Sequence, residues 1–150
     1  PETAVFVFLH GYASLCHTET LCLLNLQTFF QEFSVKRRDQ AKSLIDYLAK
    51  RGANFQTSNI KETNIKDSHK FNATTCLQLS LKMEQEVAFE LFNLRAASKL
   101  DVDFSKVLND LISEQTASQF KLQQHLHSLQ LMAAHAKDQG LSEFLFDQSL

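Results

Sequence analysis

The chain has 150 residues, 44% of them hydrophobic, and a formal net charge of −2 at pH 7, so one domain with a hydrophobic core is expected. Its longest run of like charge is the short Lys36-Arg37-Arg38, which argues against a nucleic-acid partner or an anionic membrane surface. Three glycines and one proline are too few for the tight turns of sandwiches, barrels and α/β folds, whereas long helices need few turns.

The spacing of apolar residues predicts four long helices and a short fifth helix. The first runs from the start of the chain to about Cys16, and because Pro1 falls inside it, this helix is expected to be truncated at its N-terminus. The second covers residues 23–50 and is closed by Arg51-Gly52, a basic residue followed by a glycine. Its inward face, with a spacing of three and four, comprises Leu26, Phe30, Phe33, Arg37, Gln40, Leu44 and Leu48.

Residues 56–71 are polar and patternless, which is typical of a long surface crossover. The third helix begins near Asn72 or Thr74, both good caps, and ends near Leu100. Residues 101–104 form a turn, the fourth helix follows, Gly140 breaks the chain, and residues 141–150 form the fifth helix. The inward faces are Leu77, Leu81, Glu84, Val87, Leu91 and Leu94 on the third helix, and Leu108, Leu111, Gln115, Gln119, Leu122, Leu126 and Leu129 on the fourth.

The first residues present a competing motif. Val5 to Leu9, followed by His10-Gly11, resembles the strand and loop that precede the oxyanion hole of α/β-hydrolases. That fold also requires a G-x-S-x-G nucleophile elbow later in the chain. The later glycines, Gly52 and Gly140, lie in no such motif, so the helical interpretation is favoured.

Three features together resemble the ferritin family: the stretch Gly140 to Asp147, the pair Arg51-Gly52, and Glu84 within a long helical pattern. The resemblance spans the whole chain. It implies an all-α, ferritin-like four-helix bundle with a long crossover between the second and third helices and a short fifth helix, as a single domain over residues 1–150. It also implies a shell of twenty-four subunits that stores iron as a ferric mineral.

Catalytic heavy chains of that family hold a di-iron centre made by a carboxylate on the first helix, a Glu-x-x-His pair on the second, a glutamate on the third and a glutamine on the fourth. The matching positions here are Glu2, Arg37, Gln40, Glu84 and Gln119, with Phe120 in place of Gln119 if the register slips by one residue. A guanidinium stays protonated and has no acceptor for a cation. The resemblance therefore implies remnants of a metal site, no di-iron centre and no enzymatic ferroxidase activity.

Glu2, Arg37 and Glu84 fall on otherwise apolar faces, where an unpaired charge costs several kcal/mol. We therefore expect a structural salt-bridge cluster with Arg37 between the two glutamates. Light chains of the family place a basic residue in the same role. In the alternative, Arg37 points to solvent and the glutamates are exposed.

The resemblance assigns three further sites. Light chains nucleate mineral on glutamates of the second helix, and the matching Glu32, Val35, Lys36 and Asp39 predict weak nucleation. The family's threefold iron pore corresponds to Asp110 and Glu114, beside the uncharged Asn109 and Ser113. The fifth helix lines the fourfold axis, where an apolar plug is predicted from Leu141, Phe144, Leu145 and Leu150.

The primary hypothesis is a light-chain-like subunit without a ferroxidase, which builds the shell and supports ferric mineral storage with heavy-chain-like catalytic partners. The alternative is a homologous shell protein that stores little or no iron and has a protective or chaperone-like role. A third interpretation is an active ferroxidase with a rebuilt site.

Compartment is predicted from the cysteines and from the ends of the chain. Cys16, Cys22 and Cys76 are an odd number, which fits unpaired thiols in a reducing cytoplasm or one disulfide plus a free thiol. Asn72-Ala73-Thr74 is either a helix cap or, in a secreted protein, a glycosylation site. Secretion stays an alternative, because a leader sequence could lie among residues upstream of Pro1. No run reaches the roughly 18 apolar residues of a membrane span.

Overall fold

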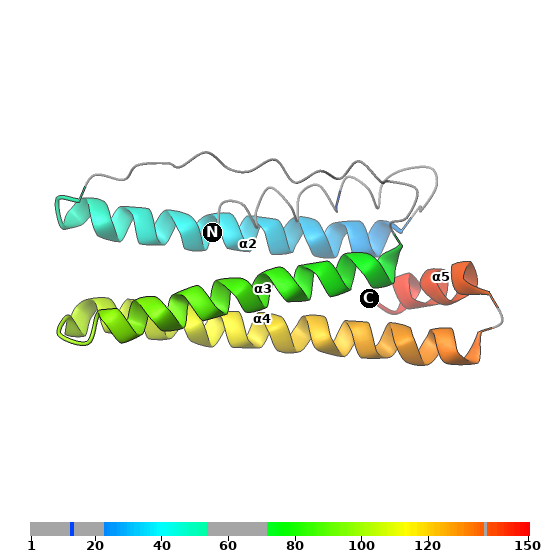
Figure 1. The fold of residues 1–150 in the computed structure, drawn as a ribbon. Coiled ribbons are helices and arrows are strands. Elements are labelled where there is room, and N and C mark those ends of the chain that lie inside the picture. Colours follow the sequence, from blue (N-terminus) through cyan, green and yellow to red (C-terminus); the bar gives the residue numbers. More distant parts are fainter. Residues whose placement is uncertain (1–12, 14–22, 54–71, 137) are drawn as a thin grey trace. The chain divides into compact units, whose positions relative to one another are not determined.

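The computed structural model describes residues 13, 23–53, 72–136 and 138–150. In this part of the chain the elements are α2 (Leu24–Lys50), α3 (Ala73–Ala97), α4 (Val102–His135) and α5 (Gln139–Ser149), and no strand occurs there (Figure 1). The all-α prediction is confirmed. The hydrolase-like motif, the crossover and, apart from the buried helical residue Ala13, the predicted first helix lie outside the described residues. None of the described helices is long and apolar enough to cross a membrane.

The chain divides into two compact units. One is formed by Pro1–Asn72 with Asp147–Leu150, and the other by Ala73–Phe146. The first unit therefore contains α2 and the last residues of α5. The second contains α3, α4 and most of α5. The prediction of a single domain over residues 1–150 stays a prediction.

An aromatic seam runs along α2. Phe29, Phe30 and Phe33 are buried, with the Phe29 ring stacked on Phe33 at 5.4 Å between centroids and edge-on to Phe30, also at 5.4 Å. Stacked and edge-on ring pairs add to the free energy of apolar burial. The aromatic residues therefore fix the inward face of α2, as their spacing predicts.

The end of α2 is a Schellman motif. Gly52 has a φ of 76°, a left-handed conformation that glycine adopts without strain. Its N–H donates to the carbonyl of Ala49 at 3.0 Å, and the Ala53 N–H donates to that of Leu48 at 3.0 Å. The predicted helix stop at Arg51-Gly52 is thereby confirmed.

Helices α3 and α4 form an antiparallel hairpin, packed side by side along their length (Figure 1). The connection differs from the prediction that residues 101–104 form a turn, because α4 already begins at Val102. Asp101 is its N-cap, and the carboxylate accepts the Phe104 N–H at 3.0 Å. The buried apolar core of the hairpin comprises Leu77, Val87, Leu91, Leu108, Leu111, Ile112, Leu122 and Leu129. Leu94 was expected inside, but it is 42% exposed near the end of α3.

The start of α5 also corrects the sequence analysis. Gly140 was expected to break the chain, but it lies inside α5, which begins at Gln139. The break falls just before it, where α4 ends at His135. The Asp138 carboxylate accepts the Gly140 N–H at 3.1 Å, so an aspartate cap, rather than a flexible glycine, starts this helix.

Candidate functional site

Glu84 is the buried acidic residue of the α3–α4 hairpin. Its side chain has no exposed surface. The Gln115 amide donates to the Glu84 carbonyl oxygen at 2.8 Å and also to its carboxylate. The Gln119 amide donates to the same carbonyl oxygen at 2.9 Å. Two glutamines one turn apart on α4 therefore supply hydrogen bonds to this one residue of α3, as a buried carboxylate requires.

The partner role of Gln115 was missed in the sequence analysis, which placed this residue on the inward face of α4 without a function. A polar side chain on an otherwise apolar face was the signal, but the depth of Glu84 opposite it depends on how the two helices align. Gln119 was the expected match to the family glutamine, and it lies beside Glu84. The alternative residue, Phe120, is 60% exposed.

Arg37 is fully buried on α2. Its Nη1 donates to Gln40 Oε1, and its guanidinium carbon lies 5.3 Å from the centroid of the Phe33 ring. Phe33 and Gln40 lie one turn on either side of Arg37, so the spacing of α2 itself brings all three together. The alternative in which Arg37 points to solvent is wrong.

The salt-bridge cluster remains a prediction. Glu2 lies outside the described residues, and Glu84 belongs to a different compact unit from Arg37. Within the described part of the chain, no group of three or more His, Cys, Asp or Glu side chains is arranged to hold a metal ion.

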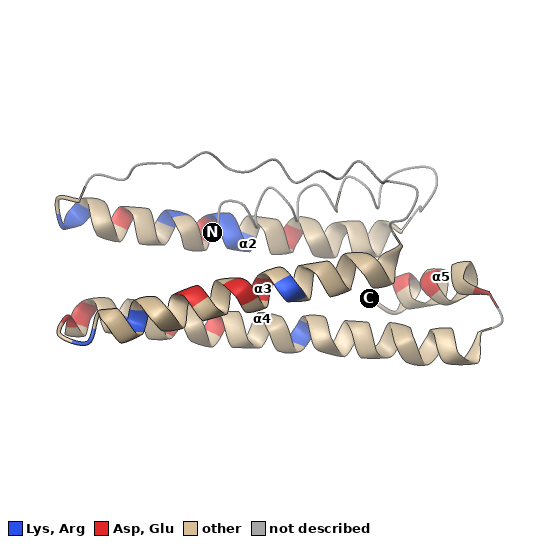
Figure 2. Ribbon diagram, in the orientation of Figure 1, with Lys and Arg blue, Asp and Glu red and all other residues tan. Residues whose placement is uncertain are grey.

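The predicted nucleation positions lie along the exposed side of α2, where acidic and basic bands alternate (Figure 2). Glu32, Lys36 and Asp39 are exposed. The Asp39 carboxylate lies 3.5 Å from the Arg38 guanidinium, with both side chains more than half exposed. Such a pair is worth little in stability, but it places positive charge next to one of the two acidic positions.

The predicted pore residues lie on α4. Asp110 and Glu114 are both exposed and are one helical turn apart, and their neighbours Asn109 and Ser113 are exposed as well. Two carboxylates therefore share one face of the helix with uncharged side chains beside them.

The buried and exposed faces of α5 have the reverse of the usual polarity. The side chains of Ser142, Glu143 and Asp147 are buried together with Phe146. The predicted plug residues are exposed at 51% for Leu141, 53% for Phe144, 48% for Leu145 and 39% for Leu150. A helix that turns its apolar side chains outward has an uncovered surface in the isolated chain.

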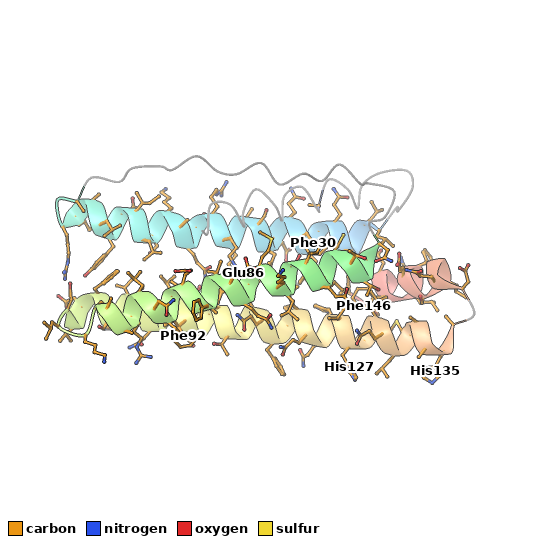
Figure 3. The ribbon with its side chains drawn as sticks, in the orientation of Figure 1. Phe30, Glu86, Phe92, His127, His135 and Phe146 are labelled. Carbon is orange, nitrogen blue, oxygen red and sulfur yellow. The ribbon has the colours of Figure 1, made fainter. Side chains whose placement is uncertain are left out.

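Two titratable groups lie near the buried face of α5. Burial raises the pKa of the Cys76 thiol to about 12, and the negative charge of Glu143 adds to the shift. Burial also lowers the pKa of His125, with a further contribution from Lys121. The His125 ring meets Phe146 edge-on at 6.0 Å, whereas His127 is exposed on α4 (Figure 3). The two histidines do not share one site.

The long antiparallel hairpin, the buried carboxylate on α3 and the short terminal helix define a protein of the ferritin-like helical class. A family model described as a ferritin-like domain matches residues 2–132. The chain therefore belongs to the ferritin family.

Individual relatives agree with this assignment. The chain is 29% identical over 147 residues to the ferritin lower subunit of Aquarana catesbeiana, covering 95% of this chain and 82% of that protein. It is 26% identical over 133 residues to the ferritin light chain, oocyte isoform, of Xenopus laevis. This match covers 87% of this chain and 73% of the Xenopus protein. It is 25% identical over 154 aligned positions to the chloroplastic ferritin-3 of Arabidopsis thaliana, covering 99% of this chain and 58% of the plant protein. Two of these three names denote a light or lower subunit.

Proposed function

We propose that this chain is an iron-storage ferritin subunit without a functional di-iron ferroxidase centre. It builds a shell of twenty-four subunits and supports ferric mineral storage, while heavy-chain-like partner subunits oxidise Fe(II). Membership of the ferritin family and the light-chain and lower-subunit relatives support this proposal.

The burial of Arg37 is the main observation that supports the proposed loss of ferroxidase activity. Arg37 and Gln40 match the Glu-x-x-His pair of catalytic subunits, and here they bond to each other. A guanidinium has no lone pair for a metal, and its positive charge repels a nearby cation. Because Arg37 is buried against Phe33 and Gln40, it is not a surface side chain that swings aside. These contacts support the proposal that this subunit has no di-iron centre.

Ferric iron is the cargo in this proposal, and the protein supplies a surface for it. Hard ferric ions favour carboxylate oxygens. Glu32 and Asp39 are the carboxylates at the matching positions of α2, with Lys36 and Arg38 between them. Nucleation on this subunit is therefore expected to be slow, and mixed shells to mineralise faster than shells of this chain alone.

The uncovered apolar surface supports assembly. Besides the plug residues of α5, Phe89 and Phe92 on α3 are 64% and 50% exposed, and Phe120 on α4 is 60% exposed. Aromatic side chains left exposed in this number are typical of surfaces that bury against other subunits.

The alternative, a shell that stores little or no iron, is favoured by the mixed charge on α2. Lys36 and Arg38 raise the local potential at the positions where a nucleation surface needs negative charge. Iron retained per particle separates the two functions.

The deciding experiment is Fe(II) loading of the purified homopolymer in air, followed by absorbance, with iron counted per particle. Slow oxidation that ends in a retained mineral core is the expected result. An intact shell without retained iron would move the function to the non-storing alternative, and fast oxidation saturating at a few irons per subunit would show an active ferroxidase.

Matched variants sharpen this experiment. Lys36→Glu adds a carboxylate beside Glu32 and Asp39, and it is expected to speed core formation. Lys42→Glu makes the same charge change at another exposed position of α2 and is expected to have a smaller effect. Equal effects of the two variants would mean that overall charge, rather than the Glu32–Asp39 surface, governs mineralisation.

A further inference from the structure

Among the described residues, the first turn of α2 receives no side-chain cap from the residue that precedes it. Leu23 occupies the N-cap position without a side-chain hydrogen bond, and the first turn contains no acidic residue. Leu23 and Leu26 are both buried. The first N–H groups of a helix have no partner within it, and buried donors require one from elsewhere.

Asp147, near the end of α5, supplies that partner from 121 residues away. One carboxylate oxygen accepts the Leu26 N–H at 2.7 Å, and the other accepts the Asn25 N–H at 3.4 Å. The Asp147 side chain is 2% exposed. The amino end of a helix carries partial positive charge, so it compensates the buried carboxylate.

The contact is reciprocal. The Asn25 side-chain amide donates to the backbone carbonyl of Asp147 at 2.8 Å. That carbonyl lies in the last turn of α5, where it also accepts the Leu150 N–H at 3.2 Å. The start of α2 therefore takes a carboxylate cap from the end of α5 and gives a side-chain donor in return, a reciprocal pair like the capping box within one segment.

The residue that makes this contact belongs to the buried face of α5. Asp147 lies on the buried face with Glu143 and Phe146, and the opposite face exposes Leu141, Phe144 and Leu145. The side chain that caps α2 therefore lies on the side of α5 opposite its exposed apolar side chains.

We propose that Asp147 and Asn25 form a latch that couples the order of the last turn of α5 to that of the first turn of α2. Release of α5 removes the Asp147 cap from the amino end of α2, and fraying of α2 removes the N–H donors that hold the end of α5. The latch is independent of iron storage, since it involves neither Arg37 nor any acidic surface position.

Hydrogen exchange on the assembled full-length protein tests the latch. In Asp147→Ala, the amides of Asn25 and Leu26 are expected to exchange about five- to tenfold faster, as loss of a helix cap predicts. The last turn of α5 is expected to loosen with them. Gln148→Ala, at the exposed neighbouring position, is the control and is expected to leave both turns unchanged. Unchanged exchange at Leu26 in Asp147→Ala would overturn the proposal.

A double-mutant cycle covers the case in which Asp147→Ala does not assemble. Asp147→Asn keeps the side-chain volume, and Asn25→Ala removes only the reciprocal donor. Denaturant midpoints of the two single variants and the double variant measure the coupling. A double variant little worse than the more damaging single variant is expected, whereas fully additive losses would show that the two residues act separately.

Discussion

At the residue scale, several buried polar side chains of the described helices have specific partners. Glu84 takes hydrogen bonds from Gln115 and Gln119, and Arg37 lies between Phe33 and Gln40. Burying such groups costs free energy unless each is satisfied. Truncating one of them therefore costs more than truncating an exposed residue of the same type.

Arg37 and Arg38 offer a matched pair for this prediction, because they are neighbours on α2 with opposite exposure. Arg37→Ala removes the partner of Gln40 and the packing against Phe33, and it is expected to lower the free energy of unfolding by about 3 kcal/mol. Arg38→Ala breaks only the exposed pair with Asp39 and is expected to cost less than about 0.5 kcal/mol. Chemical denaturation measures both losses, and equal values would contradict the buried role of Arg37.

At the element scale, α5 is unusual because its polar side chains are buried and its apolar side chains are exposed. Burial raises the pKa of Cys76 on α3, with a further contribution from the charge of Glu143, and Phe146 meets the ring of His125 on α4. This short helix therefore packs against titratable as well as apolar side chains.

Cys76 makes this dependence measurable. Its pKa rises from an ordinary 9.0 to about 12 in the folded protein. Between these values the unfolded chain releases the thiol proton while the folded chain keeps it, so stability falls as pH rises. The expected loss is up to about 1.4 kcal/mol per pH unit above 9, relative to Cys76→Ala.

Urea unfolding at several pH values between 8 and 11, under reducing conditions, checks this slope. The other titrating groups, including Cys16 and Cys22, are present in both proteins, so their contributions cancel in the difference. Parallel profiles for the wild type and Cys76→Ala would show that the thiol is not buried in this way.

At the scale of the whole molecule, the exposed apolar side chains indicate that the isolated chain is not the final state. Leu141, Phe144 and Leu145 form one such surface, and burying it against neighbouring subunits would stabilise an assembly by roughly 25 cal/mol per Å² of apolar area.

Phe144→Glu tests that surface. A charge at this position is costly to bury between subunits but harmless on an exposed helix, so the variant is expected to keep its helical content and to assemble poorly. Sedimentation and circular dichroism measure the two properties. Gln123→Glu, at an exposed position on α4, is the control. A Phe144→Glu particle of normal size and stability would place this face outside the subunit contacts.

The sequence by itself determined the helical class, the stop of α2 at Gly52 and the inward faces that include Arg37, Glu84 and Gln119. These features follow from local spacing, since a period of 3.6 residues places side chains three or four positions apart on the same face of a helix. The predicted start of α5 was wrong because Gly140 was taken as the helix break, whereas Asp138 caps a helix that already contains Gly140.

Only the tertiary structure decided which side chains satisfy the buried polar groups. The donation from Gln115 to Glu84 spans 31 residues, and the capping of Leu26 by Asp147 spans 121. Such pairs depend on the rotation and relative height of helices distant in the chain, which local periodicity does not encode. The polar face of α5 combines both origins, because Asp147 has its partners on α2 whereas Ser142 and Glu143 bond to Gln139 within α5 itself.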